Sequence, residues 1–221
     1  MYIDIHTHNQ HDSDNVIKIV NISPIELERR DVHKGVSTFF SVGVHPWEAA
    51  KGAVVTRHHT EVATFSSVIA LGEAGLDKTH PNSERQMEVF LQMIHLSETN
   101  RKPLIIHAVR SYPEIIETRK LSKAKMPWII HSFQGTKESA KQLLRHNIFL
   151  SVGEILFNKK REERAIELLE AIPEERLFLE TDDSGRDIAE VYDKAATLMR
   201  CDITRLKEQI YINFKKIFYN E

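Results

Sequence analysis

The sequence has little cysteine, and this scarcity excludes one class of fold. Cys201 is the only cysteine among 221 residues, so the chain cannot form an internal disulfide framework. A lone cysteine is typical of proteins that work in a reducing compartment. Nothing at the N-terminus resembles a signal peptide, because the first predicted strand begins at residue 2. We therefore expect a cytoplasmic protein.

Long hydrophobic runs and an excess of one charge are absent as well. No apolar run approaches the roughly 20 residues that a transmembrane helix requires, so we expect no membrane partner. The formal net charge is −2, and no overall positive field therefore predicts nucleic-acid binding. Binding to a nucleic acid would need a local basic patch.

The remaining composition is that of an ordinary soluble globular protein. Hydrophobic residues make up 41% of the chain and charged residues 28%. The length allows one sizeable core and does not require a second one. Because no repeat or low-complexity linker interrupts the chain, we expect a single domain over residues 1–221.

Eight short apolar runs recur along the chain and predict buried strands. Most are rich in Ile, Val, Leu or Phe and do not alternate with polar residues, which is the pattern of strands buried on both faces. The runs are Tyr2–His6, Val16–Ile22, Thr38–Val44, Val68–Gly72, Leu104–His107, Trp128–His131, Ile148–Val152 and Leu177–Glu180.

Segments with helical signatures separate most of these runs. Apolar residues recur close to every 3.6 positions in the long segment 81–100, and Thr136 is a suitable N-cap for another helix. Further helices are predicted at Ser111–Leu121, Arg161–Ile172, Asp187–Arg200 and Thr204–Tyr219.

Alternating strands and helices predict an α/β fold, and eight strands can close a (β/α)8 TIM barrel. The chain is short for that fold, and the connection Asn9–Asn15 is too short for a full helix. We therefore predict a compact barrel with a reduced first helix. The alternative is an open doubly wound sheet, which is disfavoured because no strand precedes a glycine-rich phosphate loop.

Six potential metal ligands occupy corresponding places at or just past the predicted strand ends. Residues two apart on a strand point to one face, so His6 and His8 form a ready pair. The C-terminal ends of barrel strands meet at one mouth, where we expect all six to converge. One strand-end histidine alone would more often be a hydrogen-bonded rim residue, but six placed alike predict a metal site. The six are His6, His8, Glu73, His107, His131 and Asp182.

Four histidines and two carboxylates exceed the needs of one tetrahedral ion. They suit two divalent ions about 3.5–4 Å apart that share a carboxylate bridge. Our hypothesis is that Glu73 is this bridge, and that the first ion is also held by His6, His8 and Asp182. The second ion is then held by Glu73, His107 and His131. Imidazole and carboxylate ligands without thiolate fit Zn, Mn, Ni or Mg.

Several motifs together resemble one known family. Asn213 and Phe218 fall where that family has similar residues in its C-terminal helix. The motifs are His6-x-His8, Gly43-Val-His45-Pro46, Gly72-Glu73-Ala-Gly-Leu-Asp77, Ile106-His107, His131-Ser-Phe-x-Gly135 and Glu180-Thr-Asp182. In this order and spacing they resemble the TatD family of metal-dependent hydrolases. The resemblance implies an amidohydrolase-like TIM barrel, divalent metals and phosphodiester hydrolysis, often as a DNase with 3′→5′ exonuclease character.

The chain also departs from the family pattern. The usual Glu-Thr-Asp-Ala-Pro becomes Glu180-Thr-Asp-Asp-Ser184, and Arg110 lies three residues past His107 where the family often has an arginine two residues past. The chain is also shorter than usual, with a curtailed first loop. These differences leave the ligand set intact and leave the substrate open between DNA, RNA and a small phosphodiester.

The expected reaction is hydrolysis by a water that two cations activate. We expect Asp182 and Glu73 to be catalytic, with Asp182 accepting the proton of that water. His45 and Arg110 are predicted to bind the substrate phosphate. Asp77 is predicted to orient a ligand histidine.

Two other functions fit the same predicted barrel. One is a metal-dependent amidohydrolase, lactonase or phosphotriesterase; many of these carry a carbamylated lysine where this chain has Glu73. The other is a binding protein that keeps metals only for structure, although structural sites rarely leave an open two-metal cluster. The sequence leaves the oligomeric state open, a monomer included.

Overall fold

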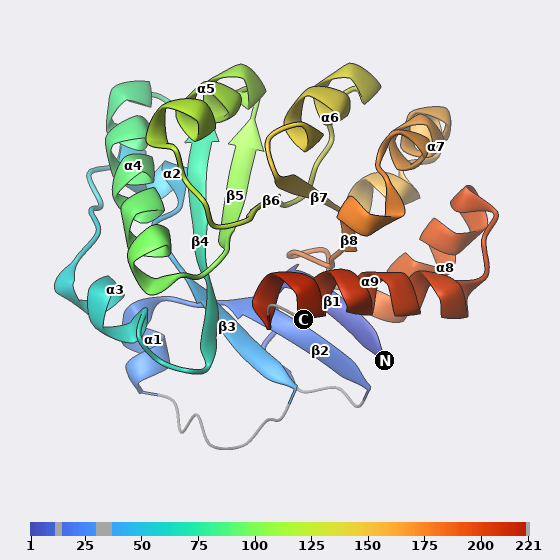
Figure 1. Cartoon of the computed structure of the whole chain (residues 1–221), viewed down its shortest axis with the longest axis horizontal. Coiled ribbons are helices and arrows are strands. Elements are labelled where there is room, and N and C mark those ends of the chain that lie inside the picture. Colours follow the sequence, from blue (N-terminus) through green and yellow to red (C-terminus); the bar gives the residue numbers. More distant parts are fainter. Residues whose placement is uncertain (12–14, 30–36, 220–221) are drawn as a thin grey trace.

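Eight parallel strands in one sheet form the framework of the protein (Figure 1). A computed structural model describes residues 1–11, 15–29 and 37–219, and the structural statements below concern these residues. Each strand pairs with the next along the chain, in the order β1 to β8. The strands are β1 (Tyr2–Thr7), β2 (Val16–Asn21), β3 (Thr38–Val42), β4 (Val68–Asp77), β5 (Leu104–Val109), β6 (Trp128–Ile130), β7 (Ile148–Val152) and β8 (Leu177–Leu179).

The first and last strands meet and nearly close the sheet into a barrel. Thr7 and Asp182 form a parallel bridge just past the end of β8. The Asp182 amide donates to the carbonyl of His6 (3.0 Å), and the His8 amide donates to the carbonyl of Asp182 (3.1 Å). The predicted TIM barrel is therefore confirmed, and the open doubly wound sheet is wrong.

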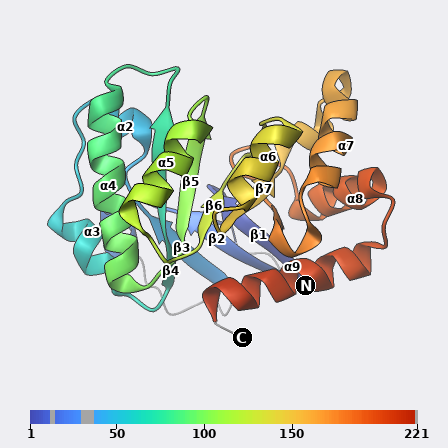
Figure 2. The same cartoon turned by 45° about the horizontal axis from the view of Figure 1, so that its top comes forward.

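Helices follow most of the strands and cover the outside of the barrel (Figures 1 and 2). The described part of the β1–β2 connection, residues 8–11 and 15, contains no helix, and α1 after β2 has only five residues. The first helical layer is therefore reduced, as predicted. The α-helices are α1 (Pro24–Glu28), α2 (Pro46–Ala50), α3 (Arg57–Val62), α4 (Ser83–Asn100), α5 (Tyr112–Ser122), α6 (Lys137–Leu144), α7 (Glu162–Ala171), α8 (Ile188–Met199) and α9 (Ile203–Phe218). Three 3₁₀ turns are η1 (Glu154–Phe157), η2 (Lys159–Arg161) and η3 (Glu174–Arg176).

The last two helices cover the wall that lacks a first helix. Tyr192 of α8 is buried, and its hydroxyl accepts from the Ile3 amide and donates to the Ile3 carbonyl, both at 3.1 Å. Helix α9 contacts β1 and β8 and lies beside the N-terminal strand in both views (Figures 1 and 2).

The predicted N-cap Thr136 accepts from the Ser139 amide at the start of α6. This cap satisfies one of the amides that a helix start leaves unpaired.

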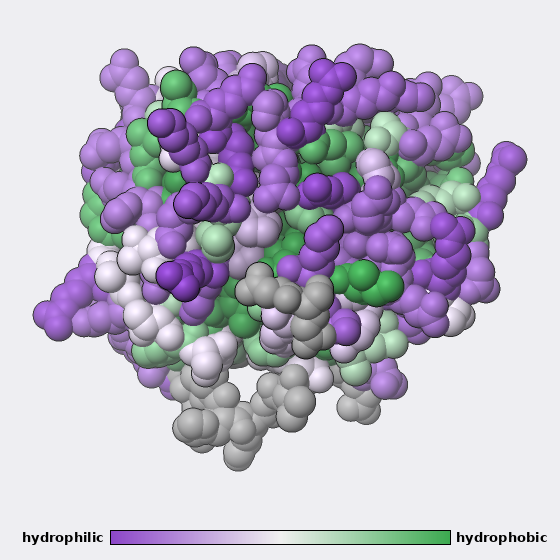
Figure 3. Space-filling view, in the orientation of Figure 1, coloured by the Kyte–Doolittle hydropathy of each residue, from purple (hydrophilic) through white to green (hydrophobic). Residues whose placement is uncertain are grey.

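The core consists of the strands and the inner faces of the helices. All residues of β6, β7 and β8 are buried, which explains their uninterrupted apolar sequences. The surface in Figure 3 is largely hydrophilic, with small apolar areas between polar side chains. Among the helices of the described residues, none is long and apolar enough to cross a membrane.

Two strands carry an irregularity that the sequence did not predict. Between Leu71 and Ala74, strand β4 has two residues opposite a single residue of β5. Strand β1 likewise has two residues, at positions 5 and 6, opposite a single residue of β2. Such β-bulges bend a strand and re-aim its side chains. Gly72 occupies the β4 bulge at φ +112°, where a Cβ atom would lie 2.2 Å from the Ile105 carbonyl oxygen. A residue with a side chain would therefore force β4 away from β5.

Candidate metal centre

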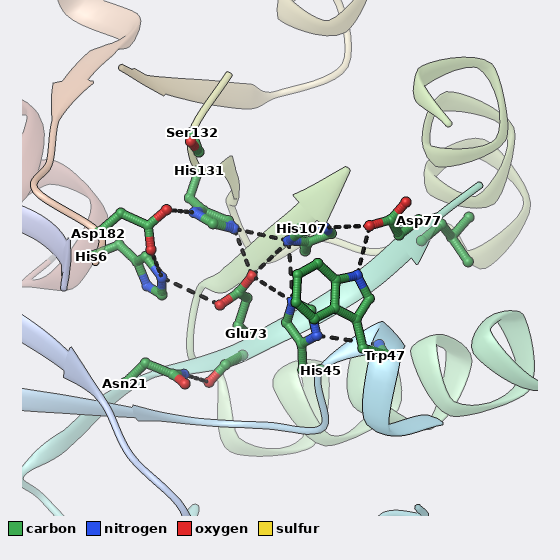
Figure 4. Close-up of polar contacts among 12 residues, drawn as sticks. His6, Asn21, His45, Trp47, Glu73, Asp77, His107, His131, Ser132 and Asp182 are labelled. Atoms are coloured by element: carbon green, nitrogen blue, oxygen red, sulfur yellow. Dashed lines mark hydrogen bonds and ion pairs between the residues drawn. The ribbon is translucent and has the colours of Figure 1, made fainter. Parts of the chain in front are cut away.

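Glu73 lies at the centre of a cluster of histidines and carboxylates inside the barrel mouth (Figure 4). The prediction that the fourth strand ends here, with Gly72 as its last residue, is wrong, because β4 continues to Asp77. The bulge in β4 turns its carboxylate into the barrel, where it is 5% exposed. His107 also lies within its strand, two residues before the end of β5.

One oxygen of Glu73 faces the two N-terminal histidines. Its Oε2 atom lies 3.4 Å from Nε2 of His6 and 3.8 Å from Nε2 of His8. Both of these nitrogens lie 3.6 Å from Oδ1 of Asp182. His6 sits at the β1 bulge, and the backbone of Asp182 is fixed by its hydrogen bonds to residues 6 and 8. The barrel closure therefore brings these four side chains together.

The other oxygen of Glu73 faces three further imidazoles. Its Oε1 atom lies 2.7 Å from Nδ1 of His107, 2.7 Å from Nε2 of His131 and 3.1 Å from Nε2 of His45. His131 directly follows β6, and His45 precedes α2. The structure thus brings all six predicted ligands together and adds His45, which we had predicted to contact substrate.

The charges of the cluster hold one another in their ionised forms. Burial opposes ionisation of Glu73, but the charge on His131 and hydrogen bonds from neighbouring histidines hold the pKa of its carboxyl well below the usual value. Burial alone would lower the pKa of His6 and of His131. Contacts of His6 with Asp182 and Glu73 outweigh this and raise its pKa to about 9, and Glu73 and Glu180 raise that of His131 well above its usual value. Protons on the imidazoles therefore offset the buried carboxylates in the metal-free protein.

His6 provides the clearest test of whether these residues suit a metal. Its side chain is fully buried. Nε2 has only the long contacts to Glu73 and Asp182 at 3.4 and 3.6 Å, and Nδ1 makes no hydrogen bond within the described residues. A buried polar atom without a good hydrogen bond costs free energy, and a cation bound at Nε2 would remove part of that cost. The donors around it are nitrogens and carboxylate oxygens, which bind divalent cations such as Zn²⁺ and Mn²⁺. The residues therefore fit a metal.

Asp77 connects the cluster to the rim. Its Oδ2 atom accepts from the Trp47 indole (2.7 Å) and lies 3.2 Å from Nε2 of His107, so it contacts the ring on the side away from Glu73. Burial opposes ionisation, but hydrogen bonds from Thr79 and Trp47 hold the pKa of the Asp77 carboxyl far below its usual range. A permanently charged carboxylate at this position fixes the orientation of the His107 ring.

Glu180 makes the corresponding contact to His131, and the motifs in the sequence had assigned no role to this residue. Its side chain is buried, Oε1 accepts from the Ser132 amide (2.5 Å), and the same oxygen lies 3.7 Å from Nδ1 of His131. The only sequence signal is its place in the motif Glu180-Thr-Asp182. The contact between Glu180 and His131 could not be deduced from the sequence, because the ends of β6 and β8 come together only when the barrel is folded.

A cavity of about 540 Å³ opens beside the cluster. It reaches from His107, His131 and Asp182 over the loops that follow β5 and β6. Arg164 of α7 donates to the carbonyls of Gln134 and Gly135 and so holds the second loop. The remaining lining residues are Ala108, Val109, Arg110, Tyr112, Ser132, Thr136 and Ser139. The predicted substrate-binding Arg110 therefore lies at this cavity.

Comparison with known sequences gives matches along most of the chain. The profile described as "TatD related DNase" matches residues 4–219. A protein of Methanocaldococcus jannaschii described as a metal-dependent hydrolase is 23% identical over 205 residues, covering 87% of this chain and 80% of that protein. The 3′-5′ ssDNA/RNA exonuclease TatD of Escherichia coli is 27% identical over 150 residues, which cover 66% of this chain and 58% of the exonuclease. The match therefore spans little more than half of that enzyme.

Two solved structures share the fold. A TatD homologue from Escherichia coli superimposes with a TM-score of 0.80 at 19% identity, covering 99% of this chain and 98% of the homologue. A hydrolase of the TatD family from Entamoeba histolytica gives a TM-score of 0.79 at 16% identity, covering 100% of this chain and 98% of the hydrolase. At these identities the likeness concerns the barrel architecture alone.

Proposed function

Since the chain belongs to the family of TatD-related DNases, we propose that it is a divalent-metal-dependent phosphodiesterase that hydrolyses DNA. One observation carries the proposal: the two oxygens of Glu73 face separate groups of imidazoles. His6 and His8 lie on one side, and His107 and His131 lie on the other. A shared carboxylate between two sets of ligands is the arrangement that two-metal hydrolases use.

In this proposal His6, His8, Asp182 and Glu73 would hold the first cation. His107, His131 and Glu73 would hold the second. Two bound divalent cations supply charge neutralisation at the phosphodiester and lower the pKa of water. The protein residues hold these ligands at fixed positions, because both Asp77 and Glu180 contact the far side of a ligand imidazole.

Asp182 is the proposed proton acceptor. Its side chain is 26% exposed, so it reaches the cavity while Glu73 remains buried. Burial opposes ionisation, but contacts with His6 and His131 hold the pKa of Asp182 below its usual value. The carboxylate is therefore ionised at neutral pH and available as a general base. General-base catalysis contributes typically about 10²–10⁴-fold to a rate.

The cavity supplies the proposed contacts to the substrate. Arg110 lines it, and a guanidinium can donate two hydrogen bonds to one phosphate. His45 lies in the neighbouring cluster, 3.1 Å from Oε1 of Glu73, and is the second proposed contact to the phosphate. The exonuclease of Escherichia coli acts on single-stranded DNA and RNA, as its name states, and we propose single-stranded DNA as the substrate here. A single strand leaves its bases free to contact the rim of the barrel.

A substrate panel tests this function. Metal-stripped protein is reloaded with Mn²⁺ or Zn²⁺ and assayed on single-stranded DNA, duplex DNA, RNA, bis-p-nitrophenyl phosphate, lactones and dipeptides. We expect metal-dependent cleavage of single-stranded DNA that EDTA abolishes. The Asp182→Asn variant is the matched control for a contaminating nuclease. Turnover of lactones or dipeptides without any phosphodiesterase activity would overturn the proposal in favour of an amidohydrolase or lactonase.

A further inference from the structure

Trp47 is an exposed aromatic residue at the edge of the metal centre. The chain has two tryptophans, and Trp128 is fully buried in β6, whereas Trp47 is 42% exposed. Trp47 lies in the first turn of α2, two residues after His45. Figure 4 shows its indole beside His45 and His107. The centroids of the Trp47 and His107 rings are 6.0 Å apart.

The orientation of this indole is fixed by its neighbours. Its N–H donates to Asp77 at 2.7 Å, and its ring stacks on that of His80 with centroids 4.5 Å apart and an angle of 23° between the planes. The His45 ring lies nearly perpendicular to it, at an angle of 86° between the planes and with centroids 4.8 Å apart. The ring has therefore lost its rotational freedom before any ligand binds, which reduces the entropy cost of binding to it.

We propose that Trp47, supported by His80, is a stacking surface for an unpaired nucleobase of the substrate. This inference rests on the proposed nuclease function and adds a contact that selects single strands. The ring lies next to the ligand His107, so a base stacked on it belongs to the nucleotide at the scissile phosphate or to its neighbour. Every base has an aromatic face, so the contact tolerates different sequences but requires a base that is not paired.

A second role for Trp47 is possible, and the variants must separate the two. The indole N–H could serve only to hold Asp77, and through it His107, in place. Trp47→Phe keeps an aromatic face and removes the N–H. Trp47→Leu removes both. A stacking role predicts that the two variants differ, whereas a positioning role predicts equal defects.

Intrinsic fluorescence gives a direct measurement of the contact. Because Trp128 is buried, quenching by an added oligonucleotide reports Trp47. The titration uses metal-loaded protein in the Asp182→Asn background, so that the strand is not cut. We expect single-stranded DNA to quench the signal and an oligonucleotide of abasic residues to leave it unchanged. The same titration with Trp47→Phe should show no quenching; equal quenching in that variant would place the source at Trp128 and overturn the inference.

Kinetics on matched substrates complete the test. Stacking of one base on an aromatic side chain is worth about 5- to 150-fold in affinity, so Trp47→Leu should raise KM for single-stranded DNA by a factor in this range. Trp47→Phe should stay within about threefold of the wild type. On a strand with abasic residues around the cleavage site, Trp47→Leu and wild type should have equal KM.

The outcomes distinguish this inference from the proposed function. If the wild type cleaves DNA and Trp47→Leu has the same penalty with and without bases, stacking is wrong and the nuclease function stands. If both variants lose kcat equally on bis-p-nitrophenyl phosphate, Trp47 is a positioning residue only. If the metal-loaded wild type cleaves no nucleic acid, the proposed function itself fails.

Discussion

Binding of divalent cations to the metal-free protein should release about two protons per chain at pH 7. Burial alone would lower the pKa of both His6 and His131, but the neighbouring carboxylates outweigh it. The pKa of His6 rises to about 9 and that of His131 rises well above its usual value. Both imidazoles are therefore protonated at neutral pH. A metal binds only the neutral ring, so each must lose its proton.

The sign and size of the effect follow from these pKa values. At pH 7 His6 lies about two pH units below its pKa, and removing its proton lowers the apparent metal affinity by about 100-fold. His131 adds a cost of the same sign. The apparent affinity should therefore rise with pH, by up to about tenfold per pH unit for each proton released. The contribution of His6 should level off above pH 9.

Calorimetry measures the released protons directly. Mn²⁺ or Zn²⁺ is titrated into stripped protein at one pH in several buffers of different ionisation enthalpy. The slope of the observed enthalpy against the buffer enthalpy is the number of protons. The His6→Gln variant, which has no titratable ring at this position, should release one proton fewer. An observed enthalpy that does not depend on the buffer would refute the reasoning, because it would mean that the imidazoles are neutral before the metal binds.

Three substitutions give further predictions. Asp182→Asn should keep the fold, as measured by circular dichroism, and lower kcat by about 10²-fold or more, since it removes the proposed general base. Glu180→Gln should weaken metal binding by about 10- to 100-fold in calorimetry, because it removes the charge that faces His131. Burial raises the pKa of the Asp4 carboxyl in the folded protein to about 7, above its usual value of 3.8. Between these two pH values the folded protein retains a proton that the unfolded chain releases, so the free energy of unfolding decreases as the pH rises towards 7. Asp4→Asn, which can still bond to Thr181, should therefore stabilise the protein at pH 8 by up to about 4 kcal/mol in urea unfolding.

Each of these predictions has an outcome that contradicts it. Full turnover of Asp182→Asn would remove that residue from the mechanism. Unchanged affinity of Glu180→Gln would mean that the contact with His131 does not orient the ring. For Asp4→Asn the comparison at pH 4 is the control, since wild type and variant should there be of similar stability; a variant that is less stable at both pH values would show that the carboxylate is needed in its charged form.

The sequence predicted the architecture because burial on both faces leaves a plain signal. The run Ile148–Val152 was predicted with the bounds that the structure has, and Thr136 was identified as an N-cap from its residue type. The fourth strand was predicted too short, ending at Gly72 and not at Asp77. Glycines and a glutamate resemble a strand end in sequence, and only the pairing with β5 makes them a bulge within the strand.

The metal cluster was predictable in its members and less so in its details. Its residues follow one rule, a ligand-type side chain near the end of a barrel strand. His45 also follows a predicted strand directly, so the same rule could have predicted that it lies beside Glu73. The supporting contact of Glu180 to His131 joins residues far apart in the chain, and no local pattern specifies it. The exposure of Trp47 likewise depends on how α2 packs at the rim, and its role and those of the predicted site residues stay predictions.

The metal content of the purified protein tests the central claim most directly. Elemental analysis should be made on wild type and on Glu73→Ala, each stripped with a chelator, reloaded and freed of excess metal. If the two oxygens of Glu73 serve two sets of ligands, the wild-type chain should retain two divalent ions and Glu73→Ala should lose bound metal. The metal-loaded wild type should also have a higher melting temperature than the stripped wild type. A wild-type chain that retains no metal, and whose melting temperature does not respond to its addition, would contradict the account.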